Sequence, residues 1–338
     1  MTVAPNEVQR AAAIDCGTNS IRLLIADIDD SGALTDVERM MTVVRLGEGV
    51  DTTGEFSSAA LERTFAAVDD YAARIARHGA ERVRFVATSA SRDVSNREEL
   101  LTGVTERLRA VAPDFAGPEV IDGNEEASLS FAGAAGVLDW EALLADRPDG
   151  KVLVVDLGGG STEFVLGTAA GAEHSVSTNM GCVRFTERHL HSDPPEQAEI
   201  DAARAEVRRI LDGLSLPLEE TRAVVGVAGT VTTITAHALS LTEYDPARIN
   251  GARLPVRAVI EAAEDLLHAD RSTRAQLGFM HPGRVDVIGA GSLIWAAILE
   301  HLAETTDGAV ASAVTSEHDI LDGIALSVVG TQGTETAP

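Results

Sequence analysis

The feature that most constrains the fold of this chain is a turn that occurs twice, each time between two apolar stretches. The first copy, DCGTNS at residues 15–20, lies between apolar residues 11–14 and 21–28. The second copy, DLGGGS at residues 156–161, lies between residues 151–155 and 162–167. Both fit the template D-x-G-x-x-S, and they are 156 − 15 = 141 residues apart. A repeat at the length of a whole domain predicts two duplicated halves with a cleft between them.

The rest of the chain alternates short apolar runs with stretches of helical spacing, which is typical of an α/β protein. We expect further strands at residues 37–46, 83–87, 120–121 and 223–228, and helices at 57–77, 95–111, from 124 onward, 196–214, 255–269, 285–302 and 316–329. We predict an N-terminal domain of residues 1–135 and a C-terminal domain of residues 136–330, whose last helix packs back on the first domain. Residues 331–338 are expected to form a flexible tail.

Charge and composition exclude several classes of protein. The net charge of −26 leaves no basic face for nucleic acid, and the 4% aromatic content argues against base-stacking surfaces. No stretch approaches the roughly 18 apolar residues of a membrane span, and residues 1–10 lack the pattern of an export signal. The two cysteines, Cys16 and Cys182, form no ligand pair and are expected to be reduced core residues. We therefore expect a cytoplasmic protein with no membrane or nucleic-acid partner.

The two D-x-G-x-x-S turns are candidate phosphate-binding sites, because their small residues let backbone N–H groups approach a phosphate closely. Asp15 and Asp156 end buried strands, where each can hold Mg²⁺ directly or through water. One such turn alone is usually a simple hairpin, but two copies, one with three consecutive glycines, favour phosphate binding. The candidate phosphate-binding residues are Gly17, Thr18, Asn19, Ser20, Gly158, Gly159, Gly160, Ser161 and Thr162.

A third glycine turn, at residues 226–230, follows another apolar strand. Its Gly229 and Thr230 could bind phosphate, or the turn could serve tight packing of a helix on a sheet. The chain has a single lysine, Lys151, so arginines must supply the positive charge that a phosphate-rich ligand requires.

Two arginines are preferred as phosphate ligands, because small hydroxyl residues surround them at strand ends. They are Arg22, which follows the first turn, and Arg92, which follows the strand 83–87. Arg184 ranks third.

Together the three turns resemble the superfamily of actin, the heat-shock chaperones and the sugar kinases. Within it the chain is most similar to the exopolyphosphatase and guanosine pentaphosphate phosphohydrolase family. Six segments carry this resemblance: IDCGTNSIRLL (14–24), ATSASRDVSN (87–96), IDGNEEASLSFAG (121–133), VVDLGGGSTEF (154–164), GCVRFTE (181–187) and GVAGTVTT (226–233). The resemblance implies an α/β fold of two duplicated actin-like (ribonuclease H-like) domains with a central interdomain cleft, in the short two-domain form.

The resemblance also implies roles for single residues. It assigns Glu126 as the general base that deprotonates the attacking water. It assigns Glu163 to a second acidic position that serves catalysis and holds a metal. Mg²⁺, with Mn²⁺ as a substitute, would bind near Asp15, Asp156 and Glu163. A homodimer is also implied.

The function that the resemblance implies is hydrolysis of the terminal phosphate of inorganic polyphosphate. Guanosine pentaphosphate is the alternative substrate, because the motifs do not describe contacts to a base or ribose. A non-catalytic nucleotide or polyphosphate sensor is an alternative of another class, but it would not need Glu126. A kinase is a third alternative, but it rests on analogy of fold alone, and that analogy does not supply a site for a phosphate acceptor.

Overall fold

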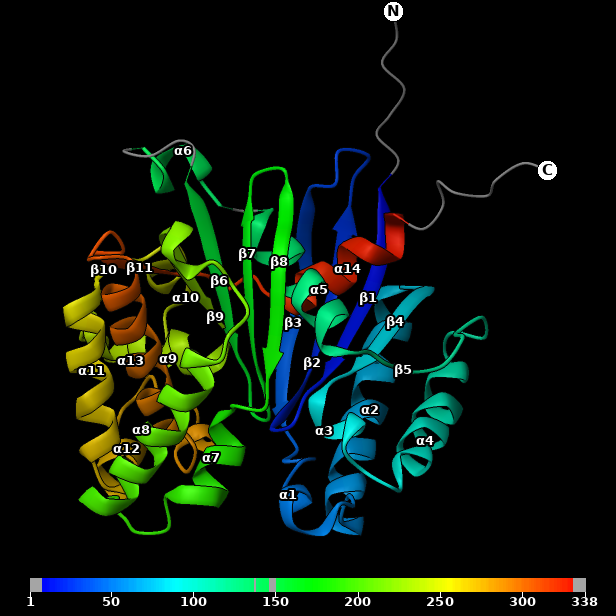
Figure 1. Ribbon diagram of the computed structural model, residues 1–338. Helices are drawn as coiled ribbons and strands as arrows, with labels where there is room; N and C mark the ends of the chain where they lie inside the picture. The colour runs from blue at the N-terminus through cyan, green and yellow to red at the C-terminus, as the bar shows by residue number, and fades with distance from the viewer. Residues whose placement is uncertain (1–7, 137, 146–149, 331–338) are drawn as a thin grey trace, which may run out of the picture. The chain divides into compact units, whose positions relative to one another are not determined.

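The computed structural model describes residues 8–136, 138–145 and 150–330. Contacts within the chain divide it at residues 122/123 and 319/320 into two compact units. Unit 1 combines the N-terminal segment with the last helix, and unit 2 is the continuous segment between them. Figure 1 shows that each unit has its own β-sheet with helices beside it.

Unit 1 contains a five-stranded sheet in the order β3-β2-β1-β4-β5. The first three strands pair antiparallel, and β4 and β5 continue the sheet parallel to β1. The strands are β1 (Gln9–Cys16), β2 (Ser20–Ile28), β3 (Leu34–Val43), β4 (Arg82–Ala87) and β5 (Glu119–Val120).

Helices cover both faces of the unit 1 sheet, since β1 and β2 are buried on both sides. On one face, alternate residues such as Ile14 and Leu23 join a core with α2 (Ser58–His78) and α4 (Arg97–Arg109). The last helix, α14 (Ile320–Gly330), packs on β1, β2 and β4. Asp322 of α14 forms an ion pair of 2.6 Å with Arg39 of β3. The short helices α1 (Val50–Thr53) and α3 (Ser89–Arg92) complete the unit.

Unit 2 repeats this sheet order, because β8-β7-β6-β9-β11 corresponds to β3-β2-β1-β4-β5. Here too the first three strands are antiparallel, and β9 and β11 run parallel to β6. An antiparallel strand, β10, adds an edge beyond β11. The strands are β6 (Lys151–Leu157), β7 (Thr162–Thr168), β8 (Gly171–Thr178), β9 (Thr221–Val227), β10 (Arg253–Pro255) and β11 (Ser312–Thr315). The predicted duplicated α/β fold is therefore confirmed.

The unit 2 sheet separates two apolar layers, as the continuous burial of β6 requires. One layer contains Leu153 and Val155 and the helices α7 (Cys182–His189), α8 (Gln197–Asp212), α9 (Ala228–Ala238), α11 (Val256–His268) and α13 (Ile288–Thr305). The other contains Val152 and Val154 with α5 (Gly123–Ala135) and α6 (Trp140–Leu143). The remaining helices are α10 (Pro246–Ile249), α12 (Arg271–Ala275) and two 3₁₀ turns, Leu218–Glu220 and Pro282–Arg284.

Helix α5 lies in unit 2, although the predicted boundary after residue 135 placed it with the N-terminal domain. It contacts β6, β7 and β8, and its Ala127 and Phe131 join the apolar layer beneath that sheet. The burial of these side chains is the physical reason that α5 groups with unit 2.

Most of the predicted elements are present within a few residues of their expected ends. The helix expected at 57–77 is α2, and Gly79 caps it with a φ of 65°. The last helix begins at Ile320 rather than at residue 316, because the Ser316 hydroxyl bonds the backbone of His318 and holds a turn there. The elements β8, β10, β11, α1, α3, α6, α7, α10 and α12 were not predicted, and the expected tail at 331–338 lies outside the described residues.

Both cysteines are buried and unbonded to one another, as expected. Among the described residues, no helix combines the length and apolar character that a bilayer crossing requires.

A close contact at the end of β9 provides a test of the packing in unit 2. A Cβ atom added to Gly226 would lie 2.7 Å from Val231 and 2.8 Å from the fully buried Trp295 ring. We expect Gly226→Ala to lower the free energy of unfolding by about 1–3 kcal/mol, because the rigid ring has no space to yield. Chemical denaturation measures this change.

Gly213→Ala is the matched control. Gly213 has a φ of −94°, and its added Cβ would make ordinary contacts of 3.5 Å. A loss in Gly226→Ala no larger than in this control would show that the contact is not tight.

Candidate active site

The second D-x-G-x-x-S turn joins β6 to β7 and places two carboxylates side by side. The Gly158 N–H donates to the Ser161 carbonyl at 3.0 Å and closes the turn. Asp156 and Glu163 lie directly opposite each other in the antiparallel pair, so their side chains share one face of the sheet. Both are buried, with 7% and 1% of their surface exposed.

Helix α5 brings a third carboxylate to this pair. A Cβ on Gly123 would lie 2.4 Å from the Cβ of Ser177 on β8, so only glycine lets the start of α5 approach the strand this closely. Glu126 follows in the first turn of the helix and is also buried. One turn later, the Ser130 hydroxyl donates to Asp156 Oδ2 at 2.7 Å. These contacts fix the helix that carries Glu126 against the strands that carry Asp156 and Glu163.

The three carboxylates form a cluster in which the charges of Glu126 and Asp156 act on the buried Glu163. The pKa of Glu163 is raised well above its usual value, first by burial and then by the charges of Glu126 and Asp156. Hydrogen bonds from Ser177, which donates to Glu163 Oε1 at 2.7 Å, and from Ser161 oppose this rise in pKa. A cation or an incoming proton would therefore stabilise this cluster.

The first turn has the same backbone geometry with a different charge pattern. The Gly17 N–H donates to the Ser20 carbonyl at 3.0 Å, as in the second turn. Asp15 lies opposite Arg22, and its Oδ2 accepts hydrogen bonds from the Arg22 Nε and Nη2 at 2.9 and 2.6 Å. Arg22 is the repeat equivalent of Glu163, since 163 − 22 = 141. The candidate metal ligand Asp15 is thus paired with a candidate phosphate ligand of its own unit.

Neighbouring segments hold the first turn in place. The Thr18 and Ser89 hydroxyls are hydrogen-bonded at 3.0 Å, which ties the turn to the segment after β4. Asn19 accepts backbone hydrogen bonds from Val44 and Arg45 through its carbonyl. Arg92 donates from Nη1 to the Ile121 carbonyl at 3.1 Å. Of the predicted phosphate residues of unit 1, Gly17, Thr18 and Asn19 directly follow β1, Ser20 and Arg22 lie in the first three residues of β2, and Arg92 ends α3.

The third glycine turn lies against an arginine that was not predicted from the sequence. A Cβ on Gly229 would lie 2.2 Å from the guanidinium carbon of Arg284, so the glycine leaves room for that side chain. Arg284 also donates to the Thr233 hydroxyl at 3.2 Å. Thr230 is buried and bonds the thiol of Cys182. Thr230 of this turn therefore serves packing, and Gly229 leaves space for the guanidinium group of Arg284.

The side chains beside the second turn have mixed roles. Arg184 donates from Nε to the Gly160 carbonyl at 3.0 Å, and a Cβ on Gly181 would lie 2.4 Å from the Gly159 carbonyl oxygen. Thr162 is fully buried, and its hydroxyl donates to the Met180 carbonyl. Its side chain therefore holds the turn together.

Three site residues, Ser130, Ser177 and Arg284, were missed from the sequence. Ser130 could have been found, because it lies one helical turn after Glu126 and shares its face. Ser177 belongs to a strand that was not predicted, and Arg284 is the last residue of a short 3₁₀ turn with no distinctive pattern.

The donor chemistry of unit 2 fits a hard divalent cation. In the described parts of the chain, no group of three or more His, Cys, Asp or Glu side chains is placed to hold a metal. Two facing carboxylates remain, Asp156 and Glu163, and Mg²⁺ characteristically binds one or two carboxylates while it keeps waters and contacts substrate phosphates. The excess negative charge at this pair is what such an ion would neutralise.

These features meet the two needs of phosphate-bond hydrolysis: backbone donors that bind phosphate oxygens, and a carboxylate that can take a proton from water. The protein is thus a hydrolase of the phosphatase class on a duplicated actin-like fold. A sequence match to the Ppx/GppA phosphatase family covers residues 24–328, so the chain belongs to that family. Enzymes of this family generally depend on a divalent metal.

Known relatives cover nearly the whole chain. A protein named Exopolyphosphatase 2 from Mycobacterium tuberculosis is 49% identical over 330 residues, which span 95% of this chain and 99% of that protein. The crystal structure of an exopolyphosphatase-like protein shares 42% identity and a TM-score of 0.88, covering 95% of this chain and 98% of the other. A Ppx/GppA family member from Aquifex aeolicus shares 28% identity and a TM-score of 0.76, covering 97% and 100%.

The repulsion at Glu163 leads to a stability prediction. Because the folded-state pKa of Glu163 is raised, its contribution to stability is present below the unfolded pKa and is lost as the pH rises through the folded value. In metal-free buffer at neutral pH, we expect Glu163→Gln to melt at a higher temperature than the native protein. The difference should shrink in acid, and added Mg²⁺ should raise the melting temperature less in the variant.

Glu219→Gln, which changes an exposed acid of the same unit, is the control for loss of one charge. A metal-free Glu163→Gln that melts at or below the control would contradict the electrostatic argument. Thermal unfolding followed by circular dichroism provides these values without any activity assay.

Proposed function

We propose that this chain is an exopolyphosphatase that releases orthophosphate from the end of inorganic polyphosphate. The observation that carries the proposal is the buried cluster of Glu126, Asp156 and Glu163 beside the glycine turn at residues 158–161. The Mycobacterium tuberculosis relative named Exopolyphosphatase 2, which matches almost the full length, supports the same substrate.

Different residues of unit 2 bind the phosphate, activate the attacking water and position the general base. Backbone N–H groups of Gly159, Gly160 and Ser161 hold phosphate oxygens at the second turn, while the Gly158 N–H closes the turn and the Ser161 hydroxyl bonds Glu163. Glu126 orients the attacking water and takes its proton as the water attacks in line with the leaving phosphate. Ser130 is a positioning residue, because it ties the helix of Glu126 to Asp156. In unit 1, the first turn and the guanidinium groups of Arg22 and Arg92 are proposed to bind further phosphate oxygens.

A divalent cation, Mg²⁺ or alternatively Mn²⁺, would be held by Asp156 and Glu163 and would neutralise charge on the phosphate oxygens. Ser177 and Ser161 orient the Glu163 carboxylate for this purpose. Asp15 differs from Asp156 because Arg22 already compensates its charge. We therefore assign Asp15 to orienting Arg22, with the cation at the second turn.

The general-base role is tested with Glu126→Gln. The amide keeps the size of the side chain but cannot take a proton, so we expect phosphate release from polyphosphate to fall about 10²–10⁴-fold. Glu125→Gln is the matched control, because Glu125 is exposed in the same helical turn. Orthophosphate release with Mg²⁺ is the measurement, and a Glu126→Gln rate within twofold of the control would remove Glu126 from this role.

Substrate choice between polyphosphate and guanosine pentaphosphate needs a direct comparison. The site residues named above contact phosphates and include no aromatic side chain on which a guanine could stack. We expect kcat/KM to be at least about tenfold higher for polyphosphate, because a site without base contacts gains little from the nucleoside. Competition of both substrates in one assay measures the ratio, and a preference for the pentaphosphate would reverse the assignment.

A further inference from the structure

A second pocket in unit 2 lies far from the carboxylate cluster and carries positive charge. It has a volume of about 300 Å³ and opens where β9 and β11 begin. Arg222 enters it from β9, Arg253 from β10 and Ser312 from β11, and Ala142 of α6 forms part of its wall. All of these residues belong to unit 2, so the pocket is a feature of that unit alone.

Among the residues that the structure describes, the two guanidinium groups of this pocket bond neutral acceptors. Arg222 donates from Nη1 to the carbonyls of Glu219 and Thr221 at 2.7 and 2.8 Å. Arg253 donates from Nε to the Ser312 hydroxyl at 2.9 Å and from Nη1 to the Ala142 carbonyl at 3.2 Å. Within the described chain, neither arginine forms an ion pair, and no carboxylate lines the pocket.

An acid close to Arg222 is already engaged elsewhere. The charge of Arg222 acts weakly on Glu220, but the Glu220 carboxylate forms an ion pair of 2.6 Å with Lys151. Each guanidinium has five N–H donors, so both arginines keep donors for a further acceptor.

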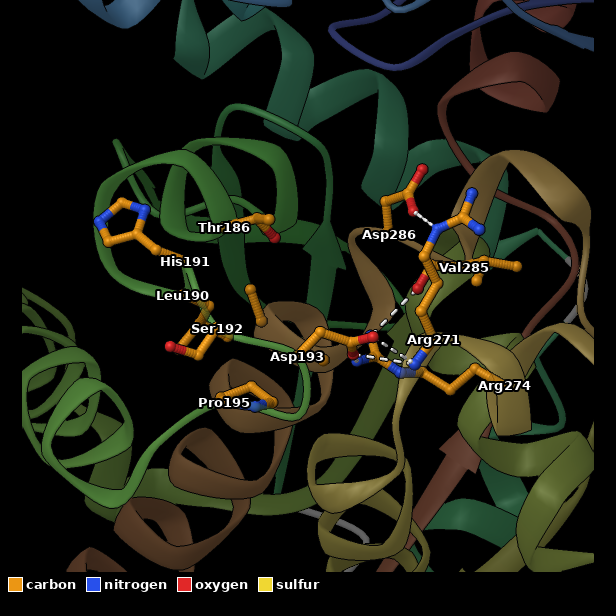
Figure 2. A pocket seen from close by; sticks show the side chains of 12 residues that line it. Thr186, Leu190, His191, Ser192, Asp193, Pro195, Arg271, Arg274, Val285 and Asp286 are labelled. Carbon is orange, nitrogen blue, oxygen red and sulfur yellow. Dashed lines mark hydrogen bonds and ion pairs between the residues drawn. The ribbon is translucent and has the colours of Figure 1, made fainter.

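Another pocket of unit 2 shows the contrasting arrangement. Figure 2 draws a smaller cavity, of about 140 Å³, that also contains two arginines, Arg271 and Arg274. Their charges are compensated, because Arg271 Nε bonds Asp286 at 2.6 Å and Arg274 Nη2 bonds Asp193 at 3.2 Å. An anion entering that cavity would have to displace these carboxylates. In the pocket of Arg222 and Arg253, the described lining residues include no carboxylate that an anion would have to displace, although the chain as a whole has a net charge of −26.

The direction of the strands sets the distance between this pocket and the carboxylate cluster. Arg222 lies near the start of β9, and Val227 at its end is paired with Asp156. Five residues of extended strand separate Arg222 from Val227, which is a distance of about 17 Å at 3.3 Å per residue. Both sites lie on one sheet, at its two ends.

We propose that Arg222 and Arg253 form a second phosphate-binding site, which holds phosphoryl groups of a polyphosphate chain whose end lies at the carboxylate cluster. Forked guanidinium groups match phosphoryl oxygens, and a polyanion can reach both ends of the sheet only if it is long enough. The site therefore favours long chains over short ones. This proposal rests on the proposed function, which supplies the substrate.

The test compares the double variant Arg222→Gln/Arg253→Gln with the native protein on polyphosphates of graded length. The matched control is Arg208→Gln/Arg257→Gln, which removes two charges from exposed arginines that already pair with carboxylates. We expect KM for long chains to rise about tenfold through loss of two charge-assisted contacts, while kcat and the KM of the shortest chains stay within twofold. Arg222→Lys/Arg253→Lys keeps both charges and should restore most of the affinity, which separates binding from misfolding.

Three results would overturn the proposal. The first is a long-chain KM equal to that of the control. The second is an equal loss on short and long chains, which would indicate general electrostatics. The third is calorimetric binding of orthophosphate that the double variant loses while its long-chain KM is unchanged, which would make the free product the occupant. Failure of the proposed function looks different, because the native protein would then release no phosphate from any chain length.

Discussion

The close approach of helix α5 to strand β8 is the contact on which the candidate active site depends. Gly123 removes the Cβ that would collide with Ser177, and the Ser130 hydroxyl then anchors the helix to Asp156. Without this approach, Glu126 would not reach the carboxylates of the β6–β7 hairpin. The repulsion that results is unfavourable in the isolated protein, and it is the kind of locally destabilised arrangement that functional sites retain.

The two halves of the repeat show how one hairpin can serve two purposes. Each half has an aspartate one residue before the end of its first strand and closes the same glycine turn with the same hydrogen bond. The residue opposite the aspartate decides the result: Arg22 neutralises Asp15, whereas Glu163 adds to the charge of Asp156. A neutral pair suits anion binding, and an acidic pair suits a cation. A single difference between the two repeats, Arg22 against Glu163, thus gives the two turns opposite charge patterns.

The strong negative charge of the chain makes the placement of each arginine informative. Many arginines in the described part of the chain bond carboxylates, as Arg271 and Arg274 do, and their charge is not available to a ligand. Arg222 and Arg253 bond carbonyls and a hydroxyl instead. Arginines that bond no carboxylate in the described part of the chain are the ones whose positive charge can attract a polyanion.

The sequence by itself determined the duplicated α/β fold, the two D-x-G-x-x-S turns and the family, because strand-turn-strand patterns and glycine spacing are local properties. It also indicated Glu126, Asp156 and Glu163 one by one. Only the tertiary structure decided that α5 belongs with the second sheet, that Ser130 and Ser177 hold the carboxylates, and that Arg22 is bonded to Asp15. These facts depend on which side chains meet across the sheet, and contacts between distant segments follow from packing that no local pattern encodes.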